Sequence, residues 1–151
     1  MNSANETKRA ILLVEDDAND IELTRRAFER NRLANSFMVA RDGAEALEML
    51  FGTSVQGPHP DLKELQLILL DLKLPKVGGL EVLRQIRADE RTKFIPVVVL
   101  TSSDEERDLI ESYGLGANSY IRKPVDFEQF IEAVRELGLY WLVLNKTVTS
   151  D

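Results

Sequence analysis

Short apolar runs alternate with amphipathic helical patterns along almost the whole chain, and this alternation restricts the fold more than any other feature of the sequence. Five apolar runs are expected to form strands, at residues 10–14, 37–40, 67–70, 95–100 and 119–121. Four of them are nearly continuous in apolar character, which is typical of strands buried on both faces of a sheet. Segments with apolar residues at helical spacing lie between and after them, at residues 20–32, 44–51, 80–88, 104–115 and 126–144. Strict alternation predicts an α/β fold, with a parallel sheet covered by helices on both faces.

Individual residues mark where several of these elements begin. Asp104 and Asp126 each precede a helical pattern and are expected to cap it, because an Asp side chain can accept from the free N–H groups of the first turn. Asp42 follows the second apolar run and is also expected to cap a helix. The expected strand-to-helix turns are marked by Gly43, Gly78 and Gly79.

Length and charge limit the kinds of protein this chain can be. Its 151 residues suit one domain, which we place at residues 10–144 between polar tails at 1–9 and 145–151. The net charge of −7 disfavours nucleic acid as a direct partner, because a phosphate backbone needs a basic face. The sequence has no cysteine, which excludes disulfides, thiolate metal sites and a cysteine nucleophile. No apolar run is long enough for a membrane span or a signal peptide, so we expect a cytoplasmic protein.

Polar residues follow four of the predicted strands. Parallel strands deliver their carboxyl ends to one edge of a sheet, and open α/β sheets bind ligands at that edge. The residues expected to meet there are Glu15, Asp16 and Asp17 after the first strand, Asp71 after the third, Thr101 at the end of the fourth and Lys123 after the fifth.

This set of side chains suits phosphoryl transfer. Clustered carboxylates repel one another unless a hard cation neutralises them, so Mg²⁺ is the expected cofactor, with Mn²⁺ or Ca²⁺ able to substitute. An ionised Asp is a competent nucleophile toward phosphorus. Asp71 is the best candidate, because it follows the most apolar run. The Lys123 ammonium and the Thr101 hydroxyl would stabilise the charge that develops on the transferred group.

Five segments in order, 14–17, 70–75, 78–79, 99–102 and 120–124, resemble the signature of the response-regulator receiver family of two-component signalling. The resemblance covers residues 10 to 140. It implies a flavodoxin-like (βα)₅ sandwich with strand order 2-1-3-4-5, in which Asp71 is phosphorylated by a histidine kinase. A receiver is a signalling protein that catalyses only its own phosphorylation and dephosphorylation.

By the same resemblance, further residues take on specific roles. Glu15 and Asp16 match the acidic pair that holds the metal, and Lys73 matches the position whose backbone carbonyl is a metal ligand. Thr101 and Tyr120 match the pair of residues that switches on phosphorylation. Lys123 matches the lysine that forms a salt bridge to the phosphorylated site, and the peptide bond before Pro124 is expected to be cis.

The long loop before the third strand and the segments 75–79, 116–120, 124–127 and 140–141 are similar to those of stand-alone regulators paired with bacterial and cyanobacterial phytochrome kinases. This closer resemblance makes a phytochrome-like sensor kinase the expected partner. The helical pattern at 126–144 bears one apolar stripe, formed by Phe127, Phe130, Val134, Leu137, Trp141 and Leu144. Further apolar residues at 139–143 fall off this stripe. They either fold back over the core or form a surface for a second copy of the chain; we expect a homodimer through this face.

Other interpretations compete with these. Asp17 alone reads as a solvated loop acid, Thr101 as a strand-end cap and Tyr120 as a core aromatic. His59, the only histidine, lies between two prolines in the turn-rich loop 52–64 and is expected at the surface. A phosphatase of the haloacid dehalogenase class would need a second Asp two residues after the nucleophile, where this chain has Lys73. A dinucleotide binder would need a phosphate-cradling loop after the first strand, which is acidic here. A degenerate receiver that only binds partners is a third alternative.

Overall fold

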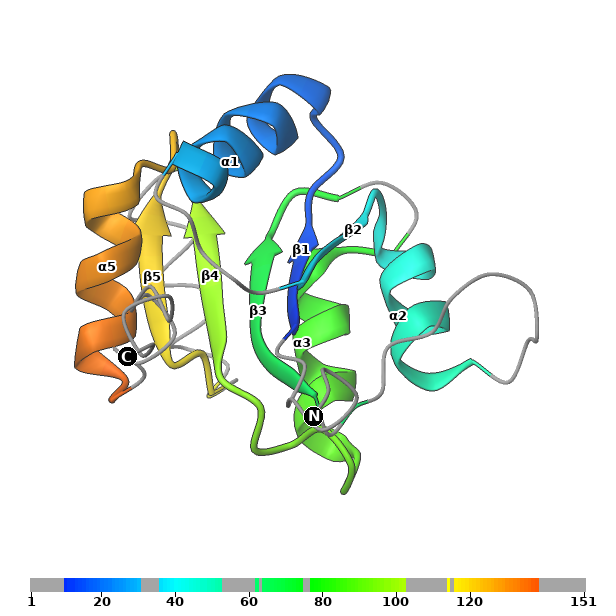
Figure 1. Ribbon diagram of the computed structural model, residues 1–151. Coiled ribbons are helices and arrows are strands. Elements are labelled where there is room, and N and C mark those ends of the chain that lie inside the picture. Colours follow the sequence, from blue (N-terminus) through cyan, green and yellow to red (C-terminus); the bar gives the residue numbers. More distant parts are fainter. Residues whose placement is uncertain are drawn as a thin grey trace, which may run out of the picture.

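Five strands form one parallel sheet in the order β2-β1-β3-β4-β5 (Figure 1). The computed structural model describes residues 10–30, 36–52, 64–74, 77–102 and 116–138, together with Leu62 and Gly114. The strands are β1 (Ala10–Val14), β2 (Ser36–Ala40), β3 (Leu65–Asp71), β4 (Val97–Thr101) and β5 (Ser119–Arg122), and the helices are α1 (Ala18–Arg30), α2 (Gly43–Phe51), α3 (Gly79–Ala88) and α5 (Phe127–Glu136). The predicted flavodoxin-like α/β class and the strand order are confirmed.

Helices cover both faces of the sheet, and each face has its own apolar core. Leu12 and Val14 of β1 pack with buried residues of α2 and α3, whereas Ile11 and Leu13 pack with buried residues of α1 and α5. All five residues of β1 are buried. Burial on both faces explains why the apolar runs are continuous and show no alternation with polar residues.

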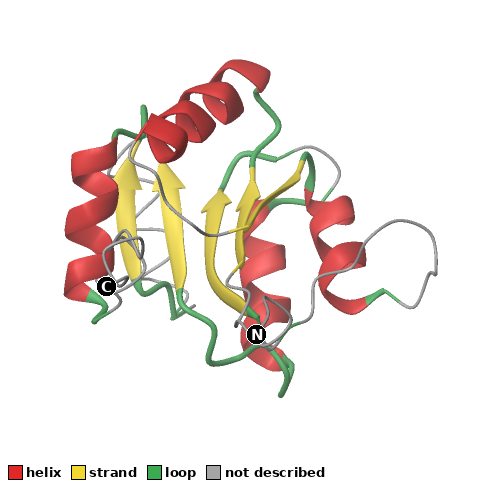
Figure 2. Cartoon of the chain, in the orientation of Figure 1, coloured by secondary structure: helices red, strands yellow, loops and turns green. Residues whose placement is uncertain are grey.

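The register of the strands brings their carboxyl ends to one edge of the sheet, where the arrowheads point in Figure 2. Val14 pairs with both Ala40 and Leu70, so β1, β2 and β3 end at the same level. Asp71 pairs with Leu100, and Thr101 pairs with Arg122. The residues that follow β1, β3, β4 and β5 therefore meet at this edge.

Two of the predicted helix caps are confirmed in the described residues. Asp42 precedes α2 and accepts from Glu45 N–H at 2.7 Å. Asp126 precedes α5 and accepts from Gln129 N–H at 2.8 Å, while the Gln129 side chain accepts from Asp126 N–H. Each cap satisfies an N–H group that has no partner within its own helix.

Two predicted helix boundaries are wrong by more than one residue within the described part of the chain. Helix α1 begins at Ala18 rather than at residue 20, because Asp17 caps it by accepting from Asp20 N–H at 2.9 Å. Helix α5 ends at Glu136 instead of continuing to residue 144. Gly138 lies at φ +74 and donates to Arg135 C=O at 3.1 Å, which is a glycine-dependent way of closing a helix.

Several predictions lie outside the described residues. They concern the helix at 104–115 with its cap Asp104, most of the loop at 52–64 with His59, the tails at 1–9 and 145–151, and the apolar residues from 139 onward. None of the helices in the described part of the chain is long and apolar enough to cross a membrane.

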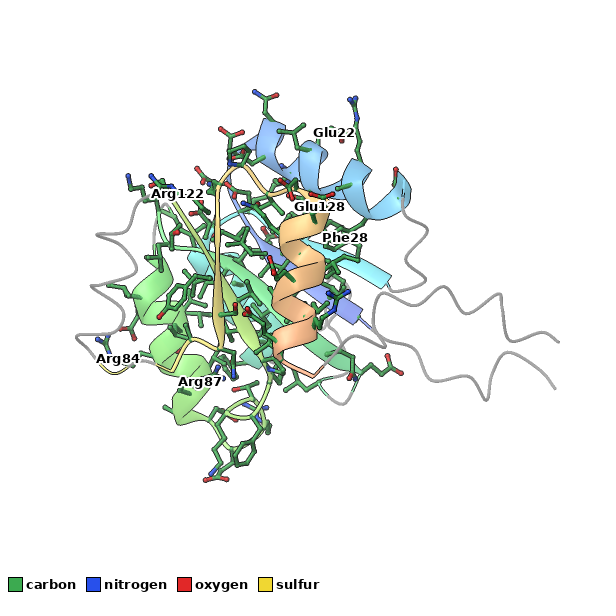
Figure 3. All side chains as sticks on the ribbon, turned by 90° about the vertical axis from the view of Figure 1, so that its left-hand side faces the viewer. Glu22, Phe28, Arg84, Arg87, Arg122 and Glu128 are labelled. Atoms are coloured by element: carbon green, nitrogen blue, oxygen red, sulfur yellow. The ribbon has the colours of Figure 1, made fainter. Side chains whose placement is uncertain are left out.

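Helix α5 contributes Phe130 to the core, and this side chain is fully buried. Its ring centroid lies 4.6 Å from that of Phe28 on α1, and Figure 3 labels Phe28 beneath α1. We therefore expect Phe130→Ala to lower the free energy of unfolding by about 3–5 kcal/mol, because it removes a large buried side chain and leaves a cavity. Urea denaturation followed by circular dichroism would measure this change. Leu23→Ala, at a site 49% exposed on α1, should cost less than about 1 kcal/mol, and equal losses in the two variants would contradict the packing described here.

Candidate functional site

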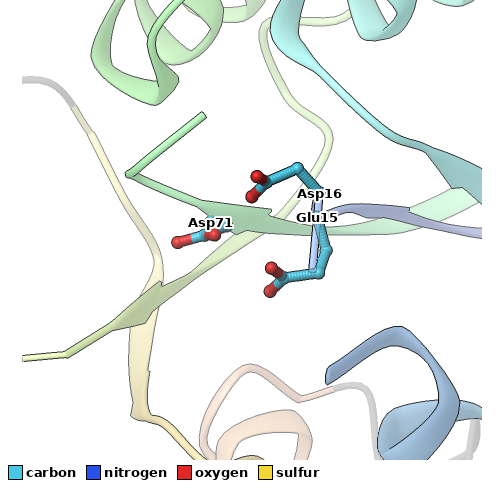
Figure 4. Close-up of side chains that lie close together, drawn as sticks. All are labelled: Glu15, Asp16 and Asp71. Atoms are coloured by element: carbon cyan, nitrogen blue, oxygen red, sulfur yellow. The ribbon is translucent and has the colours of Figure 1, made fainter. Parts of the chain in front are cut away.

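Three carboxylates gather at the carboxyl edge of the sheet, as Figure 4 shows. Glu15, Asp16 and Asp71 each offer one oxygen, and these oxygens lie within 4.8 Å of one another. Glu15 and Asp71 are almost fully buried, with side chains 1% and 4% exposed, whereas Asp16 is exposed. The sequence prediction that these acids meet at one place agrees with this geometry.

Glu15 continues the β1 ladder for one residue beyond the strand. Its N–H donates to Ala40 C=O of β2 at 2.9 Å, which fixes the backbone where the side chain enters the site. Glu15 Oε2 accepts from Asp17 N–H at 3.1 Å. Asp17 is exposed and directs its own side chain to α1 as the cap, so it matches the interpretation as a loop acid.

The chain around Asp71 is tightly packed against the start of α3. A Cβ atom on Gly79 would lie 2.5 Å from Asp71 C=O and 2.7 Å from Leu72 Cα, so only glycine fits at this position. Gly79 N–H donates to Leu72 C=O at 3.1 Å. Lys73 N–H donates to Asp71 Oδ1 at 3.2 Å, which orients the carboxylate, while the Lys73 side chain is exposed.

Lys123 brings a positive charge to these acids from the far strand of the sheet. Its Nζ lies 3.1 Å from Glu15 Oε1, 3.2 Å from Asp71 Oδ2 and 3.2 Å from Asp20 Oδ2. Lys123 N–H donates to Thr101 C=O at 2.8 Å, and the bond to Pro124 is cis as the resemblance implied. The contact with Asp20 was not foreseen, because the sequence assigned that residue only to the start of a helix.

Thr101 and Tyr120 lie at different levels of the sheet. Thr101 is buried and stands one residue beyond Leu100, the pairing partner of Asp71, so it reaches the same edge as the acids. Tyr120 pairs with Val99, lower on the sheet, and packs partly buried against the core beneath α2 and α3. The structure therefore places Thr101 at the candidate site and Tyr120 in the adjoining core.

The close approach of these charged groups shifts the pKa values of Glu15 and Lys123. Burial, followed by the nearby Asp71 carboxylate, raises the pKa of Glu15 from 4.5 to about 7. Burial alone would lower the pKa of Lys123, but the carboxylates of Asp71, Glu15 and Asp20 outweigh it and raise that pKa above its ordinary value. One ammonium thus stands among four carboxylates, and the site carries excess negative charge.

These residues fit a hard divalent cation. Oxygen ligands from carboxylates are what Mg²⁺ and similar ions prefer, and the positive charge of such an ion would offset both the burial and the repulsion that raise the pKa of Glu15. Within the described residues, Oε1 of Glu15 is fully buried and accepts no hydrogen bond of ordinary geometry, despite the nearby Lys123. A buried carboxylate oxygen with spare acceptor capacity is suited to a metal ion.

A family model described as the response regulator receiver domain matches residues 11–135. The chain is 44% identical over 137 residues to the probable methanogenesis regulatory protein FilR2 of Methanothrix harundinacea, covering 91% of this chain and 86% of that protein. It is 36% identical over 149 residues to response regulator Rcp1 of Synechocystis, covering 99% and 97% of the two chains. The match argues against the phosphatase and dinucleotide-binding alternatives. So do the lysine at position 73, where the phosphatase class needs an Asp, and the acidic residues 15–17 after β1.

Solved structures give the same picture. The bacteriophytochrome response regulator AtBRR superposes with a TM-score of 0.78 at 50% identity, covering 92% of this chain and 99% of that one. The phosphorylated cyanobacterial phytochrome response regulator RcpA gives a TM-score of 0.69 at 39% identity, covering 89% and 94%. The Mn²⁺-bound form of Rcp1 gives 0.69 at 37% identity, also covering 89% and 94%.

The raised pKa of Glu15 predicts a pH-dependent stability for the metal-free protein. Between pH 4.5 and about 7 the folded chain keeps a proton on Glu15 that the unfolded chain releases, so the free energy of unfolding falls as the pH rises through this window. Glu15→Gln removes this effect. With a chelator present, we expect the variant to gain about 1–3 kcal/mol relative to the unsubstituted chain between pH 5 and pH 8.

Urea unfolding at the two pH values would measure this difference. Adding Mg²⁺ at pH 8 should reverse the gain, because a glutamine side chain is a poorer ligand than a carboxylate. The same stability gap at both pH values would contradict the assignment of a buried, raised-pKa carboxyl to Glu15.

Proposed function

Because this chain belongs to the response regulator receiver domain family of two-component signalling, we propose that its Asp71 accepts a phosphoryl group from a sensor histidine kinase. The observation that carries the proposal is the contact of Asp71 Oδ2 with Lys123 Nζ at 3.2 Å, in a site where Glu15 and Asp16 stand close by. A buried carboxylate flanked by an ammonium and by potential metal ligands is arranged for attack on phosphorus.

The transfer exchanges one bond to phosphorus for another. A carboxylate oxygen of Asp71 attacks the phosphorus of the kinase phosphohistidine, the P–N bond breaks, and the imidazole leaves with its electron pair. Asp71 then carries an acyl phosphate. Lys123 neutralises charge on the phosphoryl oxygens from the strand next to β4, and the Thr101 hydroxyl donates to one of them, which is the positioning and charge stabilisation that phosphoryl transfer requires.

The proposed cofactor is Mg²⁺, held by the side chains of Glu15, Asp16 and Asp71 and by the backbone carbonyl of Lys73. When bound, the ion supplies positive charge that draws the phosphoryl oxygens toward the site. Mn²⁺ or Ca²⁺ could substitute, and the relative Rcp1 has been solved in a Mn²⁺-bound form. We also propose that the same residues support the hydrolysis of the acyl phosphate, which returns Asp71 to a free carboxylate.

Phosphorylation is proposed to act through Thr101 and Tyr120. The added charge draws the Thr101 hydroxyl toward the phosphoryl group, and the Tyr120 ring turns further inward against the core that it already contacts. The proposed readout surface comprises β5, α5 and the helix expected at 104–115, which lies outside the described residues. Because the chain is acidic, we propose that the signal is passed on through contacts with other proteins and not through binding to nucleic acid.

The proposed kinase is phytochrome-like and meets this chain in the cytoplasm. Support comes from relatives described as a bacteriophytochrome response regulator and as a phytochrome response regulator, at 50% and 39% identity. We also propose a homodimer through the face of the C-terminal helix. Its support is the surplus of apolar residues at 139–143, which lie outside the described residues.

Replacing the acceptor tests the assignment directly. Asp71→Asn should abolish labelling by radiolabelled acetyl phosphate in the presence of Mg²⁺, because the amide lacks the nucleophilic carboxylate oxygen. The label on the unsubstituted chain should be released by hydroxylamine, which cleaves acyl phosphates. Asp42→Asn provides a matched control, since Asp42 also follows a strand but caps α2 and is not among the acids that could share a cation. Label that persists in Asp71→Asn would refute the proposal.

Light scattering tests the homodimer. We expect a mass near twice the 17.1 kDa monomer when Mg²⁺ and beryllofluoride, a phosphoryl mimic, occupy the site. Leu142→Glu should restore the monomer, because a charge in an apolar interface is costly to bury. Glu132→Gln on exposed α5 surface serves as a control for charge. A monomeric mass with and without the mimic would contradict the proposed interface.

A further inference from the structure

Asp20 is a carboxylate that contacts the lysine of the site but stands outside the group that could share a cation. Its Oδ2 lies 3.2 Å from Lys123 Nζ. The acids whose oxygens lie within 4.8 Å of one another are Glu15, Asp16 and Asp71. Three carboxylates contact the ammonium, and a bound cation would be shared by two of them, Glu15 and Asp71. The third, Asp20, would continue to pair with Lys123.

The first turn of α1 fixes Asp20 at the rim of the site. Asp20 N–H donates to Asp17 Oδ1 at 2.9 Å, and Ile21 N–H donates to Asp17 C=O at 2.9 Å. This cap places the turn directly after the loop that carries Glu15. The Asp20 side chain is 31% exposed and the Lys123 side chain 20%, so their contact lies above the buried acids.

A divalent cation changes what holds the ammonium in place. An ion bound by Glu15 and Asp71 would take up their negative charge and would repel Lys123 directly, because charges a few ångström apart in a partly buried site are weakly screened. Asp20 is then the carboxylate among the described residues that remains within contact distance of Nζ without sharing its charge with the metal.

We propose that Asp20 is a positioning residue that keeps the Lys123 ammonium beside Asp71 once a divalent cation is bound. This inference rests on the proposed function and adds to it the residue that sets the lysine in place. With the ammonium held next to Asp71 Oδ2, the positive charge is already where the incoming phosphoryl oxygens arrive. Without Asp20, the long side chain regains rotamer freedom and spends less time there.

Phosphorylation kinetics of the full chain test the role of Asp20. Asp20→Asn keeps the shape of the side chain and removes its charge, and Asp20→Glu restores the charge. Glu22→Gln is the matched control, since Glu22 lies on the same helix (Figure 3), is exposed and pairs with Arg26 at 2.9 Å. At saturating Mg²⁺ and acetyl phosphate we expect Asp20→Asn to slow labelling about tenfold, Asp20→Glu to recover most of the rate and Glu22→Gln to match the unsubstituted chain.

A nitrogen spectrum separates positioning from a general structural effect. The Lys123 ammonium signal, observed by nuclear magnetic resonance in ¹⁵N-labelled protein, should persist after Mg²⁺ is added to the unsubstituted chain and broaden away in Asp20→Asn. Calorimetry should show that Asp20→Asn changes the Mg²⁺ Kd by no more than about twofold, because Asp20 is not a ligand. These two measurements need no phosphoryl donor, so they decide on Asp20 independently of whether Asp71 is the acceptor.

Three results would overturn the inference. The first is labelling of Asp20→Asn at the rate of the unsubstituted chain. The second is an ammonium signal that survives Mg²⁺ in that variant. The third is a Kd for Mg²⁺ weakened as much as the labelling rate, which would make Asp20 part of the metal site.

Discussion

The repulsion between two buried carboxylates is the interaction on which the carboxyl edge of the sheet depends. Glu15 and Asp71 end adjacent strands with side chains 1% and 4% exposed, and Lys123 contacts both from across β4. Removing the ammonium from such a buried set typically costs about 3–5 kcal/mol, because the carboxylates left behind have no compensation. The fold must therefore deliver Lys123 accurately, which it does through the bond from Lys123 N–H to Thr101 C=O.

The loop after Asp71 is fixed by close backbone contacts rather than by charge. A Cβ atom on Gly79 would meet Asp71 C=O at 2.5 Å, and a Cβ atom on Gly43 of α2 would overlap Val77 C=O. Because neither glycine has a side chain, α3 can pack closely against Asp71 and Leu72, and α2 can pack closely against Val77. The same segment supplies Lys73, whose N–H orients Asp71. Tight packing here gives the carboxylate one position, which an attacking group needs.

Much of the fold and of the site could be predicted from the sequence. The spacing of apolar residues follows their burial, and the residues that come directly after parallel strands lie at one edge of the sheet. The meeting of Glu15, Asp16, Asp71 and Lys123 and the caps at α2 and α5 follow from such patterns, whereas the strand order was implied by the resemblance to the receiver family. The contact between Asp20 and Lys123 could not be predicted, because the two residues are distant in sequence and α1 begins earlier than its apolar pattern does. The end of α5 was predicted wrongly, because Gly138 closes the helix while the apolar stripe continues in the sequence.

The opposite edge of the sheet is held by hydrogen bonds from one arginine to carbonyl and amide oxygens, and the contrast bears on how a change at Asp71 can spread. Arg87 of α3 donates to Gly116 C=O at 2.8 Å, to Ile95 C=O at 2.8 Å and to Asn118 Oδ1 at 2.6 Å. Asn118 Oδ1 also accepts from Val97 N–H at 2.8 Å, so the starts of β4 and β5 are tied together. The other ends of these strands meet a set of charges that a cation or a phosphoryl group would redistribute. A shift that begins there would move the carboxyl ends of β4 and β5 more readily than their amino ends, because the amino ends are held by bonds that do not involve Asp71.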